Sequence, residues 1–127
     1  MTKILVVDDD LKICKAIGAR LESIGCTVCS AHDGMSAVNV ALRELPDLIV
    51  LDINMPAGNG IKVAERLESL PNVATTPIVF ITASKDPALL QSALESRQTI
   101  IIEKPFTSEE LIQVIEMVLP NNSGLET

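Results

Sequence analysis

Residues 47–56 read Asp-Leu-Ile-Val-Leu-Asp-Ile-Asn-Met-Pro, with a continuous apolar run between two acidic residues. A short aliphatic run without polar alternation is typical of a strand that is covered on both faces of a sheet. Similar runs stand at residues 4–7, 27–29, 78–81 and 100–102. The sequence therefore predicts five buried strands, and residues 48–51 form the third of them.

Segments with the apolar period of a helix lie between the predicted strands. Apolar residues recur every three or four positions within residues 13–24 and 63–70, and in a further segment at Met35, Val38, Leu42 and Leu45. Asp86-Pro87 and the capping-box pattern Thr107-Ser-Glu-Glu110 predict the starts of the last two helices. Strands and helices therefore alternate along the whole chain.

Five strand–helix units with short connections predict parallel neighbouring strands and right-handed crossovers. The expected fold class is α/β: a doubly wound (βα)5 sandwich with a five-stranded parallel sheet in the order 2-1-3-4-5. We expect residues 1–120 to form one domain. Residues 121–127, after the helix-stopping Pro120, are expected to be a flexible C-terminal tail.

The composition narrows the classes of function. The 127 residues include 10 Lys and Arg against 17 Asp and Glu, which gives a formal net charge of −7. Direct nucleic-acid binding is disfavoured, because an acidic surface repels phosphates. No apolar run reaches the ~20 residues of a membrane-spanning helix, and the first run leads into acids, unlike a signal peptide. We expect a cytoplasmic domain without membrane association.

We expect the three cysteines to be small core residues, and not parts of a disulfide or a metal site. Cys26-Thr-Val-Cys29 has the C-x-x-C spacing, and Cys14 is the third cysteine. An offset of three on a strand puts the two thiols on opposite faces of the sheet. No second C-x-x-C and no suitably spaced histidine completes a zinc ligand set, and His32 is the only histidine.

Polar residues follow the predicted strands where each strand ends. Asp8, Asp9 and Asp10 follow the first strand, Asp52 the third, Thr82 the fourth and Lys104 the fifth. Each alone has an ordinary reading as a helix cap, turn residue or surface charge, and Asp10 is expected to be only the cap of the first helix. In the expected fold, however, the others meet at one edge of the sheet, near the point where the winding reverses.

This set of residues has the chemistry of phosphoryl transfer. Asp8, Asp9 and Asp52 would repel one another without a cation, and carboxylate oxygens suit Mg²⁺. One remaining carboxylate oxygen could then act as a nucleophile. Lys104 and Thr82 would neutralise and bind the phosphoryl oxygens.

Four motifs, in register, resemble the receiver domain of two-component response regulators, the CheY-like superfamily with a flavodoxin-like fold. They are Ile4-Leu-Val-Val-Asp8-Asp9; Asp47 to Pro56 with Gly60; Pro77-Ile-Val-Phe-Ile-Thr82-Ala83; and Lys104-Pro105-Phe106. The resemblance extends over residues 3–119. It implies that Asp52 is the phosphorylated residue, that Asp9 binds Mg²⁺ directly, and that Asp8 acts through water.

The resemblance also implies the roles of the remaining site residues. Asn54 would offer its backbone carbonyl to Mg²⁺, and Thr82 would bind the phosphoryl group and shift inward on activation. Lys104 would form an ion pair with that group, and its peptide bond to Pro105 is expected to be cis. Gly58-Asn-Gly60 would form a tight loop beside the pocket.

Three features depart from the pattern of the family. Ile101 stands where receivers carry a Tyr or Phe switch residue, so switching would depend on aliphatic repacking. Arg97-Gln98 replaces the usual Gly-Ala before the last strand. The last helix carries three glutamates and no basic residue, which argues against the charge-paired dimer of DNA-binding regulators and favours a monomer or weak dimer. Residues 100–102 are a candidate apolar docking patch.

The expected function is a phospho-accepting switch and not a turnover enzyme. A sensor histidine kinase or a phosphotransfer protein would phosphorylate Asp52, and the change would alter a surface that binds a downstream protein. Two alternatives stay within the family: a degenerate receiver that acts only as an interaction module, and a receiver fragment of a longer regulator instead of a stand-alone protein. A haloacid-dehalogenase-type phosphohydrolase would need Gly-Thr after the acids of the first strand and a substrate cap, and this sequence shows neither. An FMN carrier would need a Thr/Ser/Gly-rich phosphate loop and flanking aromatic residues, and this sequence has acids there and few aromatic residues.

Overall fold

The computed structural model describes residues 2–55, 60–95 and 100–119. Within these residues, strands and helices alternate along the chain: β1 Lys3–Val7, α1 Leu11–Ser23, β2 Thr27–Ala31, α2 Gly34–Glu44, β3 Leu48–Asp52, α3 Gly60–Glu68, β4 Ile78–Thr82, α4 Pro87–Glu95, β5 Ile100–Glu103 and α5 Ser108–Val118. Each strand contains its predicted run. The predicted tail at residues 121–127 and the Arg97-Gln98 pair lie outside the described residues.

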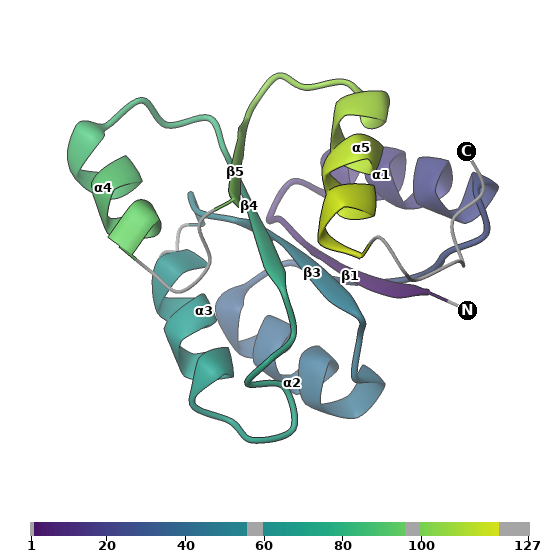
Figure 1. The fold of residues 1–127 in the computed structure, drawn as a ribbon, viewed down its shortest axis with the longest axis horizontal. Helices are drawn as coiled ribbons and strands as arrows, with labels where there is room; N and C mark the ends of the chain where they lie inside the picture. Colours follow the sequence, from purple (N-terminus) through teal and green to yellow (C-terminus); the bar gives the residue numbers. More distant parts are fainter. Residues whose placement is uncertain (1, 56–59, 96–99, 120–127) are drawn as a thin grey trace.

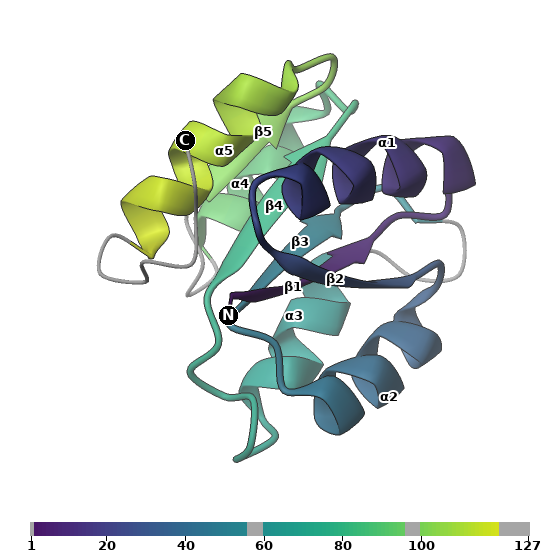
Figure 2. The same cartoon turned by 90° about the vertical axis from the view of Figure 1, so that its right-hand side faces the viewer.

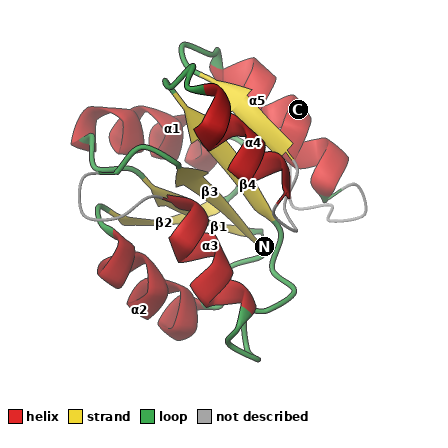
Figure 3. Ribbon diagram, turned by 90° about the vertical axis from the view of Figure 1, so that its left-hand side faces the viewer, coloured by secondary structure: helices red, strands yellow, loops and turns green. Residues whose placement is uncertain are grey.

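The strands form one parallel sheet in the order β2-β1-β3-β4-β5, which confirms the predicted topology. Helices α1 and α5 lie on one face of the sheet, and α2 and α3 lie on the other (Figures 1 and 2). Helix α4 shares the face of α2 and α3 and lies beside β4 and β5 (Figure 3). The chain is therefore a doubly wound α/β sandwich.

Two apolar clusters fill the space between the sheet and its helices. The interior strands β3 and β4 are buried along their whole length, as is β1 after its first residue, whereas the edge strands β2 and β5 are partly exposed. Cys26 belongs to the cluster under α1 and α5, and Cys29 packs against the opposite cluster. The predicted placement of these two thiols on opposite faces is confirmed.

Side-chain caps fix the starts of the helices near the carboxyl edge of the sheet. The Asp10 carboxylate accepts hydrogen bonds from the backbone N–H groups of Lys12 and Ile13, at 2.9 and 3.4 Å, so its predicted role as a cap is confirmed. Thr107 caps α5 by accepting the N–H of Glu110 at 3.1 Å. Asp8 and Asp9, the other two acids after β1, are not the cap of α1.

The predicted apolar face of α2 is partly wrong. Val38 is buried, but Met35, Leu42 and Leu45 are 79%, 38% and 54% exposed. The buried face consists mainly of smaller side chains, namely Ala37, Val38, Val40 and Ala41. Small side chains let the helix approach the sheet closely, so the face with the largest apolar residues is not the one that packs.

No helix within the described ranges is both long and apolar enough to cross a membrane.

Candidate functional site

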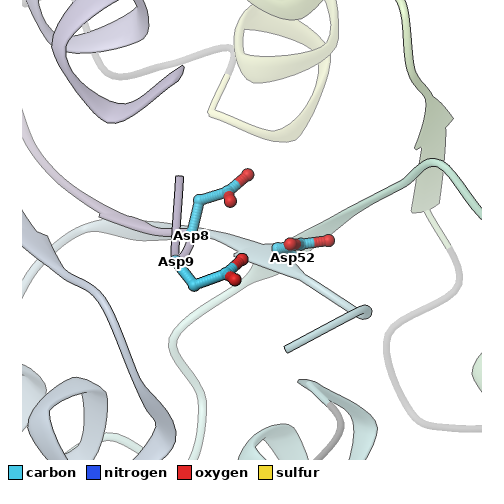
Figure 4. Close-up of side chains that lie close together, drawn as sticks. All are labelled: Asp8, Asp9 and Asp52. Carbon is cyan, nitrogen blue, oxygen red and sulfur yellow. The ribbon is translucent and has the colours of Figure 1, made fainter. Parts of the chain in front are cut away.

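The register of β1 and β3 brings the predicted acids together. Val7 pairs with Leu51, so Asp8 and Asp52 leave the sheet side by side in neighbouring parallel strands. Asp9 follows directly. Oxygen atoms of these three carboxylates lie within 4.8 Å of one another (Figure 4). The expected convergence of acids at this edge is present in the structure.

Asp8 and Asp9 differ sharply in their surroundings. The Asp8 side chain is fully buried; its Oδ1 accepts the backbone N–H of Asp10 at 2.9 Å, and its Oδ2 accepts a hydrogen bond from Lys104 Nζ at 2.8 Å. Asp9 is exposed. The pair therefore offers one carboxylate held in place by the fold and one that is open to solvent.

Asp52 is only 2% exposed, and its charge is not well compensated. Its Oδ1 accepts the backbone N–H of Asn54 at 3.0 Å, and its Oδ2 lies 3.6 Å from Lys104 Nζ. Burial above all, with the nearby charges of Asp8 and Asp9, raises the pKa of Asp52 to about 6, against the lowering effects of Asn54 and Lys104. A carboxylate in this position would gain from an additional cation.

Lys104 joins the two buried acids from the end of β5. Its ammonium is closer to Asp8, at 2.8 Å, than to Asp52, at 3.6 Å. Burial by itself would lower the pKa of Lys104, but the hydrogen bond to Asp8 and the charges of Asp52 and Asp8 outweigh it and raise that pKa. The peptide bond between Lys104 and Pro105 is cis, as the resemblance implied. Lys104 also lines a groove of about 490 Å³, together with residues that lie mainly on α1 and the β5–α5 connection.

Thr82 ends β4, where Ile81 pairs with Asp52 across the sheet. The side chain is fully buried. Its hydroxyl donates to Asn54 Oδ1 at 2.5 Å and accepts the backbone N–H of Ser84 at 2.9 Å. The resemblance implied a backbone role for Asn54, and no spacing signal predicts this side-chain contact across 28 residues.

Two further residues support the loop of acids and were not assigned to the site from the sequence. The Cys14 thiol donates to the backbone carbonyl of Asp8 at 3.4 Å, and His32 Nδ1 lies 3.2 Å from the same oxygen. Because a carbonyl only accepts, a hydrogen bond here requires the tautomer of His32 that carries its proton on Nδ1. Burial, with Asp8 close by, raises the pKa of Cys14 to about 11, so Cys14 acts here as a neutral donor.

Gly60 is required by a close backbone approach. The sequence placed Gly60 in a tight loop, whereas the structure makes it the first residue of α3; the two residues before it in that motif lie outside the described residues. A Cβ at Gly60 would lie 2.3 Å from the carbonyl oxygen of Asp52. Its N–H donates to the carbonyl of Ile53 at 2.9 Å. Any side chain here would push α3 away from the end of β3.

This arrangement of acids, lysine and threonine fits one family. The profile of the response regulator receiver domain matches residues 4–116. The chain belongs to this family. As a receiver domain of a two-component response regulator, it has the fold and the motif order that the sequence predicted.

Curated and solved relatives of this receiver agree. The "Probable transcriptional regulator ycf27" of Guillardia theta is 38% identical over 117 residues, which are 92% of this chain and 45% of that protein. The transcriptional regulatory protein CpxR of Escherichia coli is 35% identical over 119 residues, 94% of this chain and 50% of that protein. The solved chemotaxis protein CheY4 of Vibrio cholerae has a TM-score of 0.87 and 30% identity, with 94% of this chain and 99% of that chain covered. The receiver spans about half the length of these curated relatives.

The departures from the family pattern have structural counterparts in this receiver. Ile101 is half-buried on β5 and packs against the cluster under α2, α3 and α4, together with Leu89 of α4. Glu109 of α5 forms an ion pair with Arg20 of α1 at 3.1 Å, so one of the acids of α5 is engaged within the chain. The other exposed groups of α5 include Met117, which is 74% exposed.

The donor set fits a magnesium ion. All the ligand atoms that converge here are carboxylate oxygens, which suit a hard divalent cation, and soft ligands are not among them. Burial and the neighbouring acids raise the pKa of Asp52, so a bound cation would favour its charged form. Lys104 lies 2.8 Å from Asp8 and 3.6 Å from Asp52, so its single positive charge is shared between two buried acids.

Proposed function

We propose that this receiver is a phospho-accepting switch. A carboxylate oxygen of Asp52 attacks the phosphorus of a phosphohistidine on a sensor histidine kinase or a phosphotransfer protein. The new O–P bond forms as the P–N bond breaks, and the imidazole nitrogen takes the electron pair and then a proton. The products are an aspartyl phosphate and an unmodified histidine.

The observation that carries this proposal is the position of Asp52. Its carboxylate is buried at the end of the central strand, yet it lies within reach of two further acids and an ammonium. A purely structural acid in this place would be neutralised by one partner. The arrangement instead keeps Asp52 as a desolvated, poorly compensated carboxylate, which favours its reaction with an electrophile.

Asp9 and Asp52, Asp8 through water and the backbone carbonyl of Asn54 are the groups that would hold Mg²⁺. When bound, the ion supplies positive charge to the oxygens of the transferred phosphoryl group. Lys104 then offers its ammonium to the same group, and Thr82 offers its hydroxyl. Each demand of phosphoryl transfer is matched by a residue at the carboxyl edge of the sheet.

The phosphorylated receiver acts by binding and not by turnover. We propose that it signals to a downstream protein through a changed surface, that it is a monomer or weak dimer, and that it makes no direct contact with nucleic acid, consistent with the net charge of −7. The names of several relatives as transcriptional regulators support an output in transcription for longer proteins that carry such a receiver.

Intact-mass measurement after incubation with acetyl phosphate and Mg²⁺ tests the proposal. Wild-type protein should gain one phosphoryl mass, and Asp52→Asn should gain none. Asp33→Asn is the matched control: Asp33 is an exposed cap of α2 that contacts Ser36, and Asn is also a helix cap, so phosphorylation should be unaffected. Wild-type protein that stays unmodified under these conditions would leave a degenerate interaction module as the better function.

A further inference from the structure

The Thr82 hydroxyl is already fully engaged in this structure. It has one proton, and that proton is donated to Asn54 Oδ1 at 2.5 Å. Its oxygen accepts the backbone N–H of Ser84 at 2.9 Å, and the side chain is completely buried. A hydroxyl in this state cannot donate to a phosphoryl oxygen until the bond to Asn54 is broken.

Asn54 is well placed to hold Thr82 and to release it. Its backbone N–H donates to Asp52 Oδ1 at 3.0 Å, which fixes the main chain next to the acceptor carboxylate. Its side chain belongs to an exposed residue, so after release the amide can bond to water at little cost. The same residue therefore contacts Asp52 through its backbone and Thr82 through its side chain.

We propose that the Asn54 carboxamide is a positioning residue that holds the Thr82 hydroxyl in the unphosphorylated protein and competes with the phosphoryl group for it. The inference rests on the proposed function, because it assumes that Thr82 donates to a phosphoryl group on Asp52. The carboxamide thereby opposes the switch, and its removal strengthens the response to phosphorylation.

A double-mutant cycle tests this competition with magnesium and beryllium fluoride as the phosphoryl mimic. The four proteins are wild type, Asn54→Leu, Thr82→Val and the double variant, and isothermal titration gives the affinity of each for the mimic at saturating Mg²⁺. Leu has the size of Asn but accepts no hydrogen bond, and the exposed position tolerates it. The Mg²⁺ affinity of each variant is also measured without the mimic, and its effect on binding of the mimic is judged against that value.

Asn54→Leu should bind the mimic about 2- to 12-fold more tightly than wild type, the range expected for one hydrogen bond that no longer has to be broken. In the Thr82→Val background the same substitution should change nothing. As a matched control, Thr82→Ser keeps the hydroxyl and should preserve the gain. The inference is overturned if Asn54→Leu binds the mimic no more tightly than wild type, or if the same gain in affinity appears in the Thr82→Val background, which lacks the hydroxyl. Wild-type protein that binds no mimic would instead refute the proposed function, and the inference with it.

A direct observation of the resting protein completes the test. In metal-free wild-type protein, the Thr82 hydroxyl proton should exchange slowly enough to be seen by NMR, because it is buried and bonded on both sides. Asn54→Leu should abolish or strongly shift that signal. A signal that is unaffected by the substitution would show that Asn54 does not hold the hydroxyl in solution.

Discussion

The carboxylate of Asp52 should destabilise the metal-free protein at neutral pH, and Asp52→Asn should therefore stabilise it. Burial and the nearby acids raise the pKa of Asp52 from 3.8 to about 6, so the folded state disfavours its charged form relative to the unfolded state. A difference of roughly two pH units corresponds to about 3 kcal/mol. Asn keeps the shape of the side chain and can still accept the N–H of Asn54, while it removes this cost.

The pH dependence has the opposite sign from that of a salt-bridged aspartate. Between pH 3.8 and about 6 the folded protein binds more protons than the unfolded chain, so this group's contribution to stability falls as pH rises. The gain from Asp52→Asn should thus be about 3 kcal/mol at pH 7.5 and only about 1 kcal/mol at pH 4.5. Below the ordinary pKa of an aspartate the difference should vanish.

Urea unfolding, followed by far-ultraviolet circular dichroism in the presence of EDTA, measures this difference at each pH. Asp33→Asn is a control of opposite sign, because hydrogen bonds from Ser36 lower the pKa of Asp33 and its charge is favoured in the folded state. Saturating Mg²⁺ should reduce or reverse the advantage of Asp52→Asn. An Asp52→Asn variant that is no more stable than wild type at pH 7.5, or whose gain grows toward pH 4.5, would refute the reasoning.

Four further substitutions probe how the fold is held together around the site and elsewhere. Lys104→Met should lower the unfolding free energy of the metal-free protein by about 3 kcal/mol, because the buried Asp8 carboxylate loses its partner. Urea unfolding in EDTA measures this loss, and an unchanged unfolding free energy would show that the ion pair does not stabilise the fold. Gly60→Ala should lower the unfolding free energy by about 2 kcal/mol because of the backbone clash, whereas Gly18→Ala in α1, where the nearest atom to a new Cβ is at 3.5 Å, should raise it by about 0.5–1 kcal/mol. Thermal melts that rank the two variants the other way would contradict this. Leu45→Gly should stabilise by about 0.5–1 kcal/mol, because Leu45 has a φ of 48° and its side chain is 54% exposed; an unchanged or lower melting temperature would count against it.

The sequence predicted most of the fold because its signals are local and agree with one another. Apolar runs set the strands, and parallel strands in register place the residues that follow them at one edge. Asp8 and Asp52 could therefore be expected to meet before any coordinates were known, since each directly follows or ends an apolar run. Asp10 was separable from its neighbours because a cap must stand at the start of a helix.

The parts that were not predicted depend on geometry that sequence spacing does not carry. The predicted buried face of α2 was partly wrong. Both large and small apolar side chains of this helix could pack on the sheet, and the close approach of the helix selects the small ones. The contact between Asn54 and Thr82 depends on side-chain rotamers at the ends of two strands. The bonds from Cys14 and His32 converge on a backbone carbonyl, which has no signature in the sequence at all.

The position of the acceptor on an interior strand explains why the site can be reactive. β3 is buried at every residue, and a carboxylate at its end is desolvated by the same packing that stabilises the sheet. On the partly exposed edge strand β5, Glu103 follows the same kind of apolar run but is exposed to solvent. A hydrated acid there would keep its ordinary affinity for water and would gain little from a cation or a phosphoryl group. The apolar interior thus both holds Asp52 in place and raises the free energy of its charge, and binding at the site can relieve that cost.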